Sequence, residues 1–183
     1  MAQYRFIFQM QIEVFMNRMK VINEPSDLVP MLRAVDTESK RQVLKEVTLE
    51  WRTARDIEEK YGKEGKEALK FLEKMKLVET RWQSSSKSPQ PEKAYHTYYS
   101  SFHISVTWPV YEISDVLSIA MMSESEFRKV EKRILEEIGQ EGKFAGDVAE
   151  SLGMTSTMLK SMVKRSIHLD LRGHRVERFK EEM

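Results

Sequence analysis

The sequence predicts an α+β, mostly helical fold in which a winged helix-turn-helix is repeated twice, and three observations support this prediction. First, residues 43–62 align without a gap with residues 134–153, which lie 91 positions further along the chain. Second, each copy is followed by a segment with the apolar periodicity of an amphipathic helix. Third, each of those helices is followed by two strand-like segments. Such internal similarity indicates a repeated structural unit.

The repeat preserves an apolar pattern and a closing glycine. Its seven identical pairs are Leu44/Leu135, Glu46/Glu137, Glu50/Glu141, Ala54/Ala145, Asp56/Asp147, Glu59/Glu150 and Gly62/Gly153. Its conservative pairs are Val43/Ile134, Val47/Ile138, Arg52/Lys143 and Ile57/Val148. This pattern is typical of the first two helices of a helix-turn-helix, which pack together across a tight turn.

Composition narrows the class of protein. With 40% hydrophobic and 32% charged residues, the sequence is typical of a soluble globular protein, and no stretch is apolar enough to span a membrane. Cysteine is absent, which excludes disulfides and thiolate metal sites. No secretory signal is evident, so we expect a cytoplasmic protein. Because the net charge is only +1, any surface that binds nucleic acid must be local.

The N-terminal segment, residues 1–24, is predicted to be a strand or an extension of the fold. Apolar residues alternate with polar ones from Tyr4 to Met16, which is the period of a half-buried strand. Such a strand needs a partner, either a later strand or a second subunit. Met19 is an alternative start, which leaves open whether residues 1–18 belong to the native protein.

The first predicted domain covers residues 25–109 and begins with three helices. Ser26 and Thr37 are candidate N-caps of the first two helices. Thr53, three residues before an acid, resembles half of a capping box for the third helix. Gly62 stands where a helix commonly ends.

A fourth helix over residues 63–75 has two distinct faces. Apolar residues fall on one side, and a lysine stripe falls opposite: Lys63, Lys66, Lys70 and Lys74. Strand-like segments at 77–83 and 95–108 follow, joined by a polar loop that holds Lys87 and Lys93. Two strands after such a helix predict a wing.

The second half of the chain repeats this order. Residues 110–123 are predicted to form a linking or dimer-forming helix, and residues 124–183 a second, smaller winged helix domain. Within it, Thr155 caps a third helix, and Gly173 is the turn of a short hairpin.

The lysine stripe of the first domain is the first candidate for contact with DNA. In a helix-turn-helix the outer face of the third helix enters the major groove, and lysines there would meet phosphates. The alternative is a solvated face on which Glu67 and Glu73 pair with the lysines, as on most charged helices. Lys87 and Lys93 suit a wing that touches phosphates, and equally suit any exposed loop.

The second domain is the more basic. Between residues 154 and 180 there are seven cations and two acids, and clustered cations supply the phosphate component of binding. The alternative is a basic tail offset by the acidic helix before it. Hydroxyl groups that could reach phosphates or base edges come from Thr155, Ser156 and Thr157. The candidate cations are Lys160, Lys164, Arg165, Arg172 and Arg175.

Other functions find little support in the sequence. The four histidines lack the spacing of a metal site, and the signatures of phosphate-binding loops, serine hydrolases and zinc proteases are absent. We therefore expect no enzyme activity, no metal and no cofactor. Trp51, Trp82 and Trp108 are expected to lie in the core.

Residues 41–106 resemble the ArsR-type winged-helix regulators, and most closely the archaeal branch with an appended C-terminal region. The resemblance rests on VLKEV, TARDIEEKYG, ALKFLEKMKLVETRW and KAYHTYYSSF. The pattern of Leu72, Met75, Leu77, Val78 and Glu79 is typical of the passage from recognition helix to wing in that family. The cysteine metal box of the metal-sensing members is absent around residues 52–56, so thiolate metal sensing is not implied.

The resemblance implies a transcriptional regulator that binds double-stranded DNA, as a homodimer, through its third helix and wing. The rival interpretation is a winged-helix module of the transcription or chromosome machinery that binds a protein partner without base-specific contacts. The acids beside the lysine stripe and the near-neutral net charge favour that rival.

Overall fold

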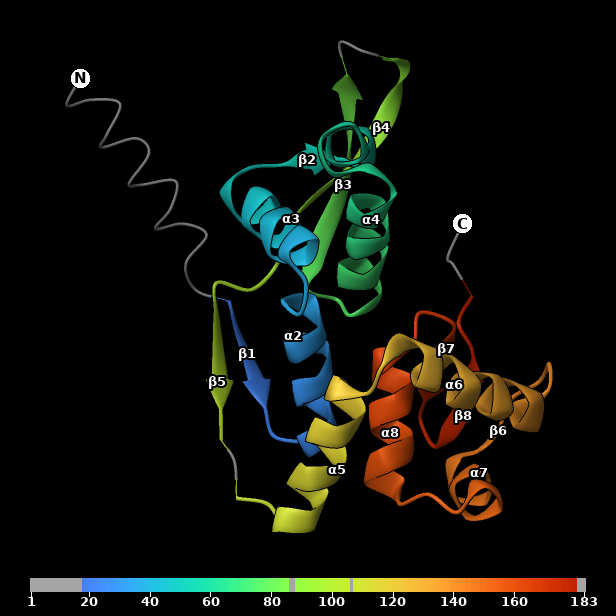
Figure 1. The fold of residues 1–183 in the computed structure, drawn as a ribbon. Coiled ribbons are helices and arrows are strands. Elements are labelled where there is room, and N and C mark those ends of the chain that lie inside the picture. Colours follow the sequence, from blue (N-terminus) through green and yellow to red (C-terminus); the bar gives the residue numbers. More distant parts are fainter. Residues whose placement is uncertain (1–17, 86–87, 106, 181–183) are drawn as a thin grey trace. The chain divides into compact units, whose positions relative to one another are not determined.

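The computed structural model describes residues 18–85, 88–105 and 107–180. It is an α+β structure of helices and small sheets (Figure 1). The chain forms two compact units, each described separately below. Unit 1 contains the described residues up to Ile22 together with Ala34–Ser105, and unit 2 contains Asn23–Arg33 together with the described residues after Ser105.

Unit 1 has the helix and strand order predicted for a winged helix. Thr37 accepts a hydrogen bond from the Lys40 amide at 3.2 Å, which confirms it as an N-cap. Thr53 and Asp56 form a reciprocal capping box, also as predicted. The elements are β1 (Met19–Ile22), α3 (Glu38–Leu49), β2 (Arg52–Thr53), α4 (Ala54–Lys74), β3 (Val78–Ser85), β4 (Ser88–Thr97) and β5 (Ser101–Ile104).

A glycine divides α4 into two helices. Gly62 has φ 65° and ψ −156°, a non-helical conformation that residues with a Cβ rarely adopt. Residues 54–61 and residues 63–74 are therefore separate segments that meet at a kink. Gly65 lies just beyond it, where an added Cβ would stand 2.6 Å from the Cβ of Tyr61. The two segments can approach this closely only because residue 65 has no side chain.

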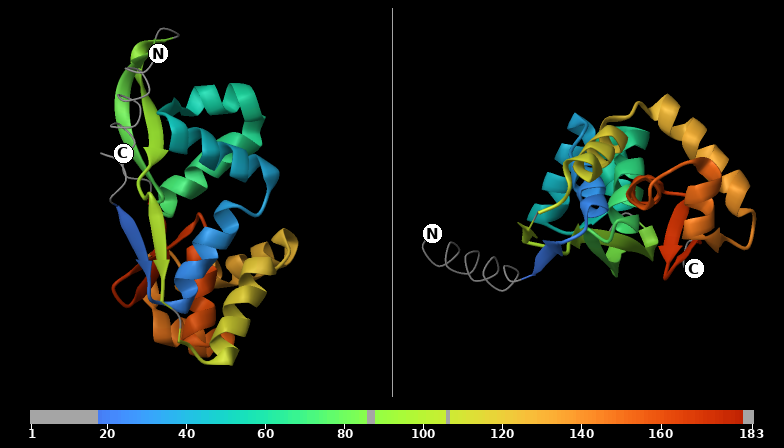
Figure 2. Two further views of the ribbon diagram at one scale, coloured as in Figure 1. Left: turned by 90° about the vertical axis from the view of Figure 1, so that its left-hand side faces the viewer. Right: turned by 90° about the horizontal axis from the view of Figure 1, so that it is seen from below.

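The core of unit 1 lies between its helices and a three-stranded sheet of order β2-β4-β3. Figure 2 shows α3 and α4 on one side of the β3–β4 hairpin. The apolar residues predicted from helical spacing are buried there. This core consists of Ala34, Val43, Val47, Ile57, Ala68, Leu69, Phe71, Leu72, Met75, Leu77, Val78 and Tyr95.

The wing differs from its predicted boundaries. Instead of a long polar loop before a strand at 95–108, β4 covers Ser88–Thr97, and Lys93 lies within it. Pro89 and Pro91 are tolerated there because β2 pairs with β4 only at Tyr95 and Ala94. At the prolines β4 thus has a single neighbour, β3, and its other edge needs no amide donor.

Of the remainder of the predicted strand at 95–108, Ser101–Ile104 forms β5, which pairs in parallel with β1. Met19 lies opposite Ser101, and Ile22 lies opposite Ile104. A strand in the 1–24 region thus pairs with a later strand of the same chain. The alternating segment from Tyr4 to Met16 lies outside the described residues.

Unit 2 contains the same succession of helices and strands after residue 123. Its sheet has the order β6-β8-β7, with a short strand at one edge as in unit 1. Ser123 caps α6 through a capping box, and Thr155 caps α8 as predicted. The elements are η1 (Pro25–Asp27), α2 (Leu28–Ala34), α5 (Val110–Met121), α6 (Glu124–Ile138), β6 (Lys143–Phe144), α7 (Ala145–Leu152), α8 (Ser156–Arg165), β7 (Leu169–Arg172) and β8 (Arg175–Arg178).

Two parts of unit 2 depart from the sequence prediction. Ser26 does not cap a helix with its side chain, since it is buried within η1, whose N-cap is Glu24. The segment predicted to be a linking or dimer-forming helix is α5, which packs into unit 2: Ile119 belongs to the main core, and Val116 and Ala120 pack against Val29. No helix in the described part of the chain is long and apolar enough to cross a membrane.

The repeat encodes the same ion pair in both units. In unit 1 Glu46 of α3 pairs with Arg52 of β2 at 3.1 Å and also accepts a hydrogen bond from Lys60. In unit 2 Glu137 of α6 pairs with Lys143 of β6 at 2.6 Å. The identical glutamate and the matched basic residue of the repeat thus join a helix to the short strand that follows it.

Substitution of the dividing glycine should destabilise the protein. Gly62→Ala forces a Cβ into a conformation that costs about 1–3 kcal/mol, and urea unfolding should reveal that loss. Gly153→Asn is the matched control because Gly153 has φ 65° and ψ 36°, a left-handed conformation that asparagine tolerates. Equal losses in the two variants would contradict this account of Gly62.

The Glu46 cluster should make stability depend on pH. The hydrogen bond from Lys60 lowers the pKa of Glu46 below its usual range, and Tyr61 and Arg52 lower it further. A lowered pKa in the folded state adds stability above the unfolded pKa of about 4.3, and this stability is lost as pH falls through the folded value. Glu46→Gln should therefore be less stable than wild type at pH 7, with the difference shrinking below about pH 4.

Urea unfolding at several pH values measures this difference, and Glu67→Gln is the control because its pair with Lys63 is exposed and 3.8 Å long. A gap between Glu46→Gln and wild type that stays constant from neutral to acid pH would rule out the assigned role of Glu46.

Candidate nucleic-acid interface

The second segment of α4 presents the lysine stripe predicted from the sequence. Its opposite face is buried through Ala68, Leu69, Phe71 and Leu72. Lys63 and Lys70 are exposed, and Lys66 and Lys74 are half-buried. The packing of unit 1 therefore turns the predicted cationic face toward solvent.

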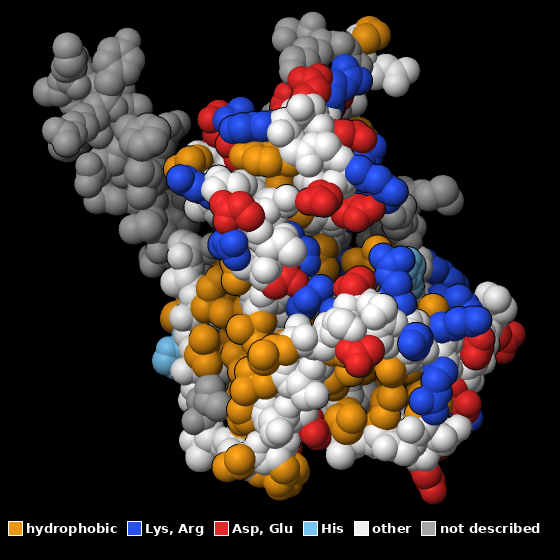
Figure 3. Space-filling view, in the orientation of Figure 1, with side chains coloured by type: hydrophobic (Ala, Val, Ile, Leu, Met, Phe, Trp, Pro, Cys, Tyr) orange, Lys and Arg blue, Asp and Glu red, His pale blue; other side chains and the backbone are white. Residues whose placement is uncertain are grey.

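Carboxylates lie beside these lysines. Lys66 pairs with Glu58 at 2.8 Å, Lys63 lies 3.8 Å from Glu67, and Lys93 of the wing pairs with Glu73. In Figure 3, blue and red side chains alternate over the region where Figure 1 places α3 and α4. Ion pairs this exposed contribute only about 0–1 kcal/mol each, so a phosphate can replace the carboxylate at little cost.

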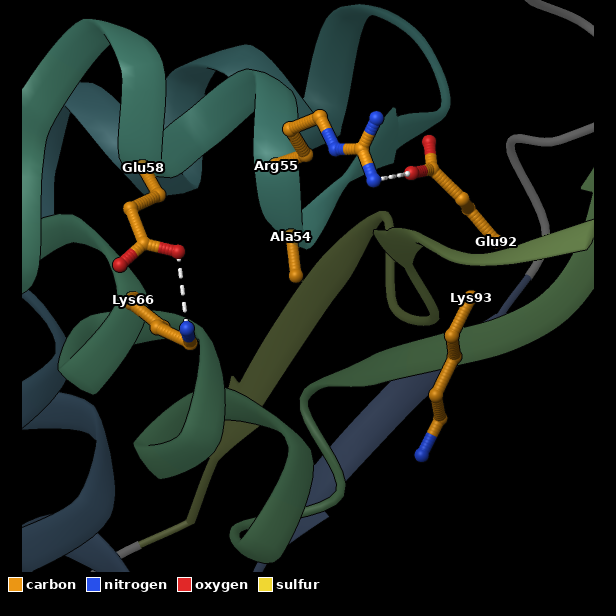
Figure 4. A pocket seen from close by; sticks show the side chains of 6 residues that line it. All are labelled: Ala54, Arg55, Glu58, Lys66, Glu92 and Lys93. Atoms are coloured by element: carbon orange, nitrogen blue, oxygen red, sulfur yellow. Dashed lines mark hydrogen bonds and ion pairs between the residues drawn. The ribbon is translucent and has the colours of Figure 1, made fainter. Parts of the chain in front are cut away.

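A shallow pocket of about 330 Å³ lies where α4 faces the wing (Figure 4). Arg55 pairs with Glu92 across it at 2.8 Å, and the Lys66–Glu58 pair forms another part of its wall. Arg55 was not among the candidates predicted from the sequence, although its position in the first turn after the Thr53 cap could be recognised there. The lining residues are Ala54, Arg55, Glu58, Lys66, Glu92 and Lys93.

The tryptophans of unit 1 are placed differently from one another. Trp82, expected in the core, is 72% exposed on β3, and this expectation is wrong. It lies opposite Lys93 on β4. Trp51 is half-buried, with the ring of His96 stacked 5.3 Å away and the Arg81 guanidinium 4.1 Å from its centre. Lys87 lies outside the described residues.

In unit 2 the hydroxyl candidates surround the start of α8. Ser156 and Thr155 are exposed, and Thr155 donates a hydrogen bond to Asp115 of α5 at 3.1 Å. Thr157 donates to Glu112 of α5 at 3.2 Å. Two of the three predicted hydroxyls are therefore already bonded to carboxylates of the same unit.

The cations of α8 are engaged within unit 2 as well. Lys160 lies 3.4 Å from Glu24, and Lys164 lies 2.5 Å from Asp27. The side chain of Arg165 is only 1% exposed and donates to the carbonyl of Ile119 at 2.6 Å. Arg165 thus packs inside the unit, in contrast to the DNA contact expected from the sequence.

The hairpin of unit 2 holds the remaining candidates at its tip. Arg172 and Arg175 are exposed on either side of the Gly173 turn. Arg172 lies 3.4 Å from Asp170, and Arg175 donates to the carbonyl of Gly142 at 2.9 Å. Of the cations predicted in unit 2, these two arginines are the most accessible.

The two groups of candidates are thus differently accessible, and the position of each follows from its own unit. The lysine stripe of α4 faces solvent, whereas most of the α8 set contacts η1 and α5. No group of three metal-ligating side chains occurs within the described ranges.

Comparison with known proteins identifies the family. A search of curated proteins finds no match. The model of the ArsR transcriptional regulator family matches residues 22–180 and so extends through both units. Since this match covers far more than half of the sequence, the chain belongs to the ArsR family of transcriptional regulators.

Proposed function

We propose that this protein regulates transcription by binding double-stranded DNA through two winged-helix units, acting as a homodimer. The observation that carries the proposal is the exposed lysine face of α4, which follows a glycine turn and lies beside the β3–β4 hairpin. A helix in that position is the one that enters the major groove in helix-turn-helix proteins. Its apolar face is anchored in the core, so only the lysine face is available to a ligand.

The contact surface proposed for unit 1 consists of the lysine stripe and the wing. Lys63, Lys66, Lys70 and Lys74 would meet phosphates from the helix, and Lys87 and Lys93 from the hairpin. A homodimer would place two such helices at half-sites about one helical turn, roughly 34 Å, apart. The exposed arginines at the tip of the unit 2 hairpin would add phosphate or minor-groove contacts.

A second function is favoured by two specific observations. Several lysines of the stripe have carboxylate neighbours, and Trp82 is largely exposed on the wing. Exposed tryptophans are common anchors in protein interfaces. A winged-helix module that binds a protein partner would use these features without reading bases.

Retention of DNA separates the two functions. Purified full-length protein would be titrated against pooled genomic fragments at a low and a high salt concentration. Tight, sequence-selective retention is expected of the regulator. Absence of retention even at low salt would favour the protein-binding module.

Removal of two lysines should weaken DNA binding in a salt-dependent way. Lys66→Ala combined with Lys70→Ala is expected to reduce affinity several-fold and to lower the slope of log K against log salt by about one unit per lost phosphate contact. Fluorescence anisotropy over a salt series measures both quantities. Lys129→Ala with Lys132→Ala removes the same charge from α6 and serves as the control. The same slope in both double variants would exclude α4 as the contact helix.

A further inference from the structure

Helix α8 of unit 2 is packed on two opposite sides. One side contributes Leu159, Met162 and Val163 to the main core of the unit. The other side carries Thr157, Lys160, Ser161 and Lys164, at the spacing of one helix face, and it meets η1 and α5. Figure 1 shows α5 running beside α8. In a winged helix that second side is the face that enters the major groove.

The elements that cover α8 place four carboxylates against its polar groups. Glu24 and Asp27, from η1 and its N-cap, reach Lys160 and Lys164. Asp115 and Glu112, from α5, accept hydrogen bonds from Thr155 and Thr157 at 3.1 and 3.2 Å. Carboxylate and phosphate oxygens are both anionic acceptors of the same donors. The covering acids therefore stand where DNA phosphates would bind this helix.

The contact of α8 with η1 and α5 is rich in polar groups. The hydroxyls of Ser26 and Ser161 are fully buried and have no hydrogen-bond partner among the described residues. A buried hydroxyl left unsatisfied is costly, and apolar residues would avoid that cost. The small apolar cluster nearby joins α2 to α5 and includes no residue of α8: it consists of Val29, Val116 and Ala120 with Leu28 beside them. A face that also meets a polar ligand would retain such serines.

The two ends of α5 are held differently. At its C-terminal end Arg165 donates to the carbonyls of Ile119 at 2.6 Å and Met122 at 2.8 Å. Ile119 is itself part of the main core. Toward its N-terminal end the polar contacts with α8 are those of Glu112 and Asp115, which join hydroxyls only. The C-terminal end of α5 is therefore tied to α8 and to the main core more extensively than its N-terminal end is.

We propose that η1 and the N-terminal half of α5 form an autoinhibitory cover on α8, whose carboxylates compete with the phosphates of double-stranded DNA for Lys160 and Lys164. Unit 2 then contributes a second DNA-binding helix only after its acidic cover leaves Lys160 and Lys164. The inference rests on the proposed function, since it requires that the chain bind DNA. The carboxylates of the cover would then set the affinity of unit 2 for DNA.

Neutralisation of the cover tests this mechanism in the full-length protein. The variant Glu24→Gln with Asp27→Asn should release Lys160 and Lys164, so that two more phosphates are bound and the salt slope steepens by about two units. Between about 50 and about 200 mM salt, the loss of affinity should then be roughly tenfold greater than for wild type. Glu136→Gln with Glu141→Gln raises the net charge of the same unit equally, at exposed positions away from α8, and should leave the slope near the wild-type value.

Two further measurements keep the test independent of any one variant. Lys160→Ala with Lys164→Ala should abolish the gain in the neutralised protein but leave the wild-type slope unchanged, because the cover already holds those lysines. When DNA is added, hydrogen exchange should show η1 and the first turns of α5 losing protection in the neutralised protein but not in wild type.

The outcomes separate the two proposals. If wild type binds DNA while the neutralised and control variants have the same salt slope, the cover is overturned and the proposed function stands. The cover is likewise overturned if bound DNA leaves the protection of η1 and α5 unchanged in the neutralised protein. If none of these proteins retains DNA, both proposals fail together.

Discussion

A glycine turn fixes where each helix after the repeat begins. In unit 1 that residue is Gly62, whose conformation ends one helix and redirects the chain into the next. In unit 2 it is Gly153, in the left-handed region. Every side chain on the following helix takes its direction from that turn. The apolar residues then enter the core, and the cationic residues face away from it.

The repeat is best understood as scaffold that precedes these turns. Its conserved glutamate and matched cation tie a helix to a short edge strand in both units, through Glu46 with Arg52 and Glu137 with Lys143. These pairs are partly exposed and therefore add little to the free energy of folding. Their main effect is to position the helix relative to the short strand. What differs between the units is the environment of the helix that follows. The lysines of α4 face solvent, whereas α8 is covered by acidic elements.

Local signals in the sequence predicted most of the helices and their caps. Thr37, Thr53 and Thr155 each cap a helix by accepting a hydrogen bond from the amide three residues later. Such a bond involves no distant part of the chain, so the local sequence is enough to predict it. A wing was correctly predicted, but its extent was not, since the length of β4 follows from its pairing with β3 between Ser88 and Thr97. Trp82 was misplaced for a similar reason: periodicity does not reveal which face of a strand lacks a cover.

The candidate site could be predicted only in part. The cations of α4 and α8 were recognisable from spacing and charge. The carboxylates that pair with the cations of α8 were not recognisable from the sequence. Asp27 and Lys164, for example, are 137 positions apart, and no local pattern indicates that their segments are in contact. The same separation explains why the predicted boundary at residue 25 differs from the observed units: residues 23–33 follow a strand of unit 1 yet pack in unit 2.

The placement of Asn23–Arg33 in unit 2, between two parts of unit 1 in the sequence, affects how the chain folds during synthesis. Asn23–Arg33 leaves the ribosome before most of unit 1, but the rest of unit 2 emerges only after Ser105. Unit 1 can therefore complete its core during synthesis, while Val29 waits for Val116 and Ala120. Contacts between such distant segments close slowly, because a long loop must first be ordered. During that interval the early segment is exposed, so chaperone binding and proteolysis of the nascent chain should concentrate there.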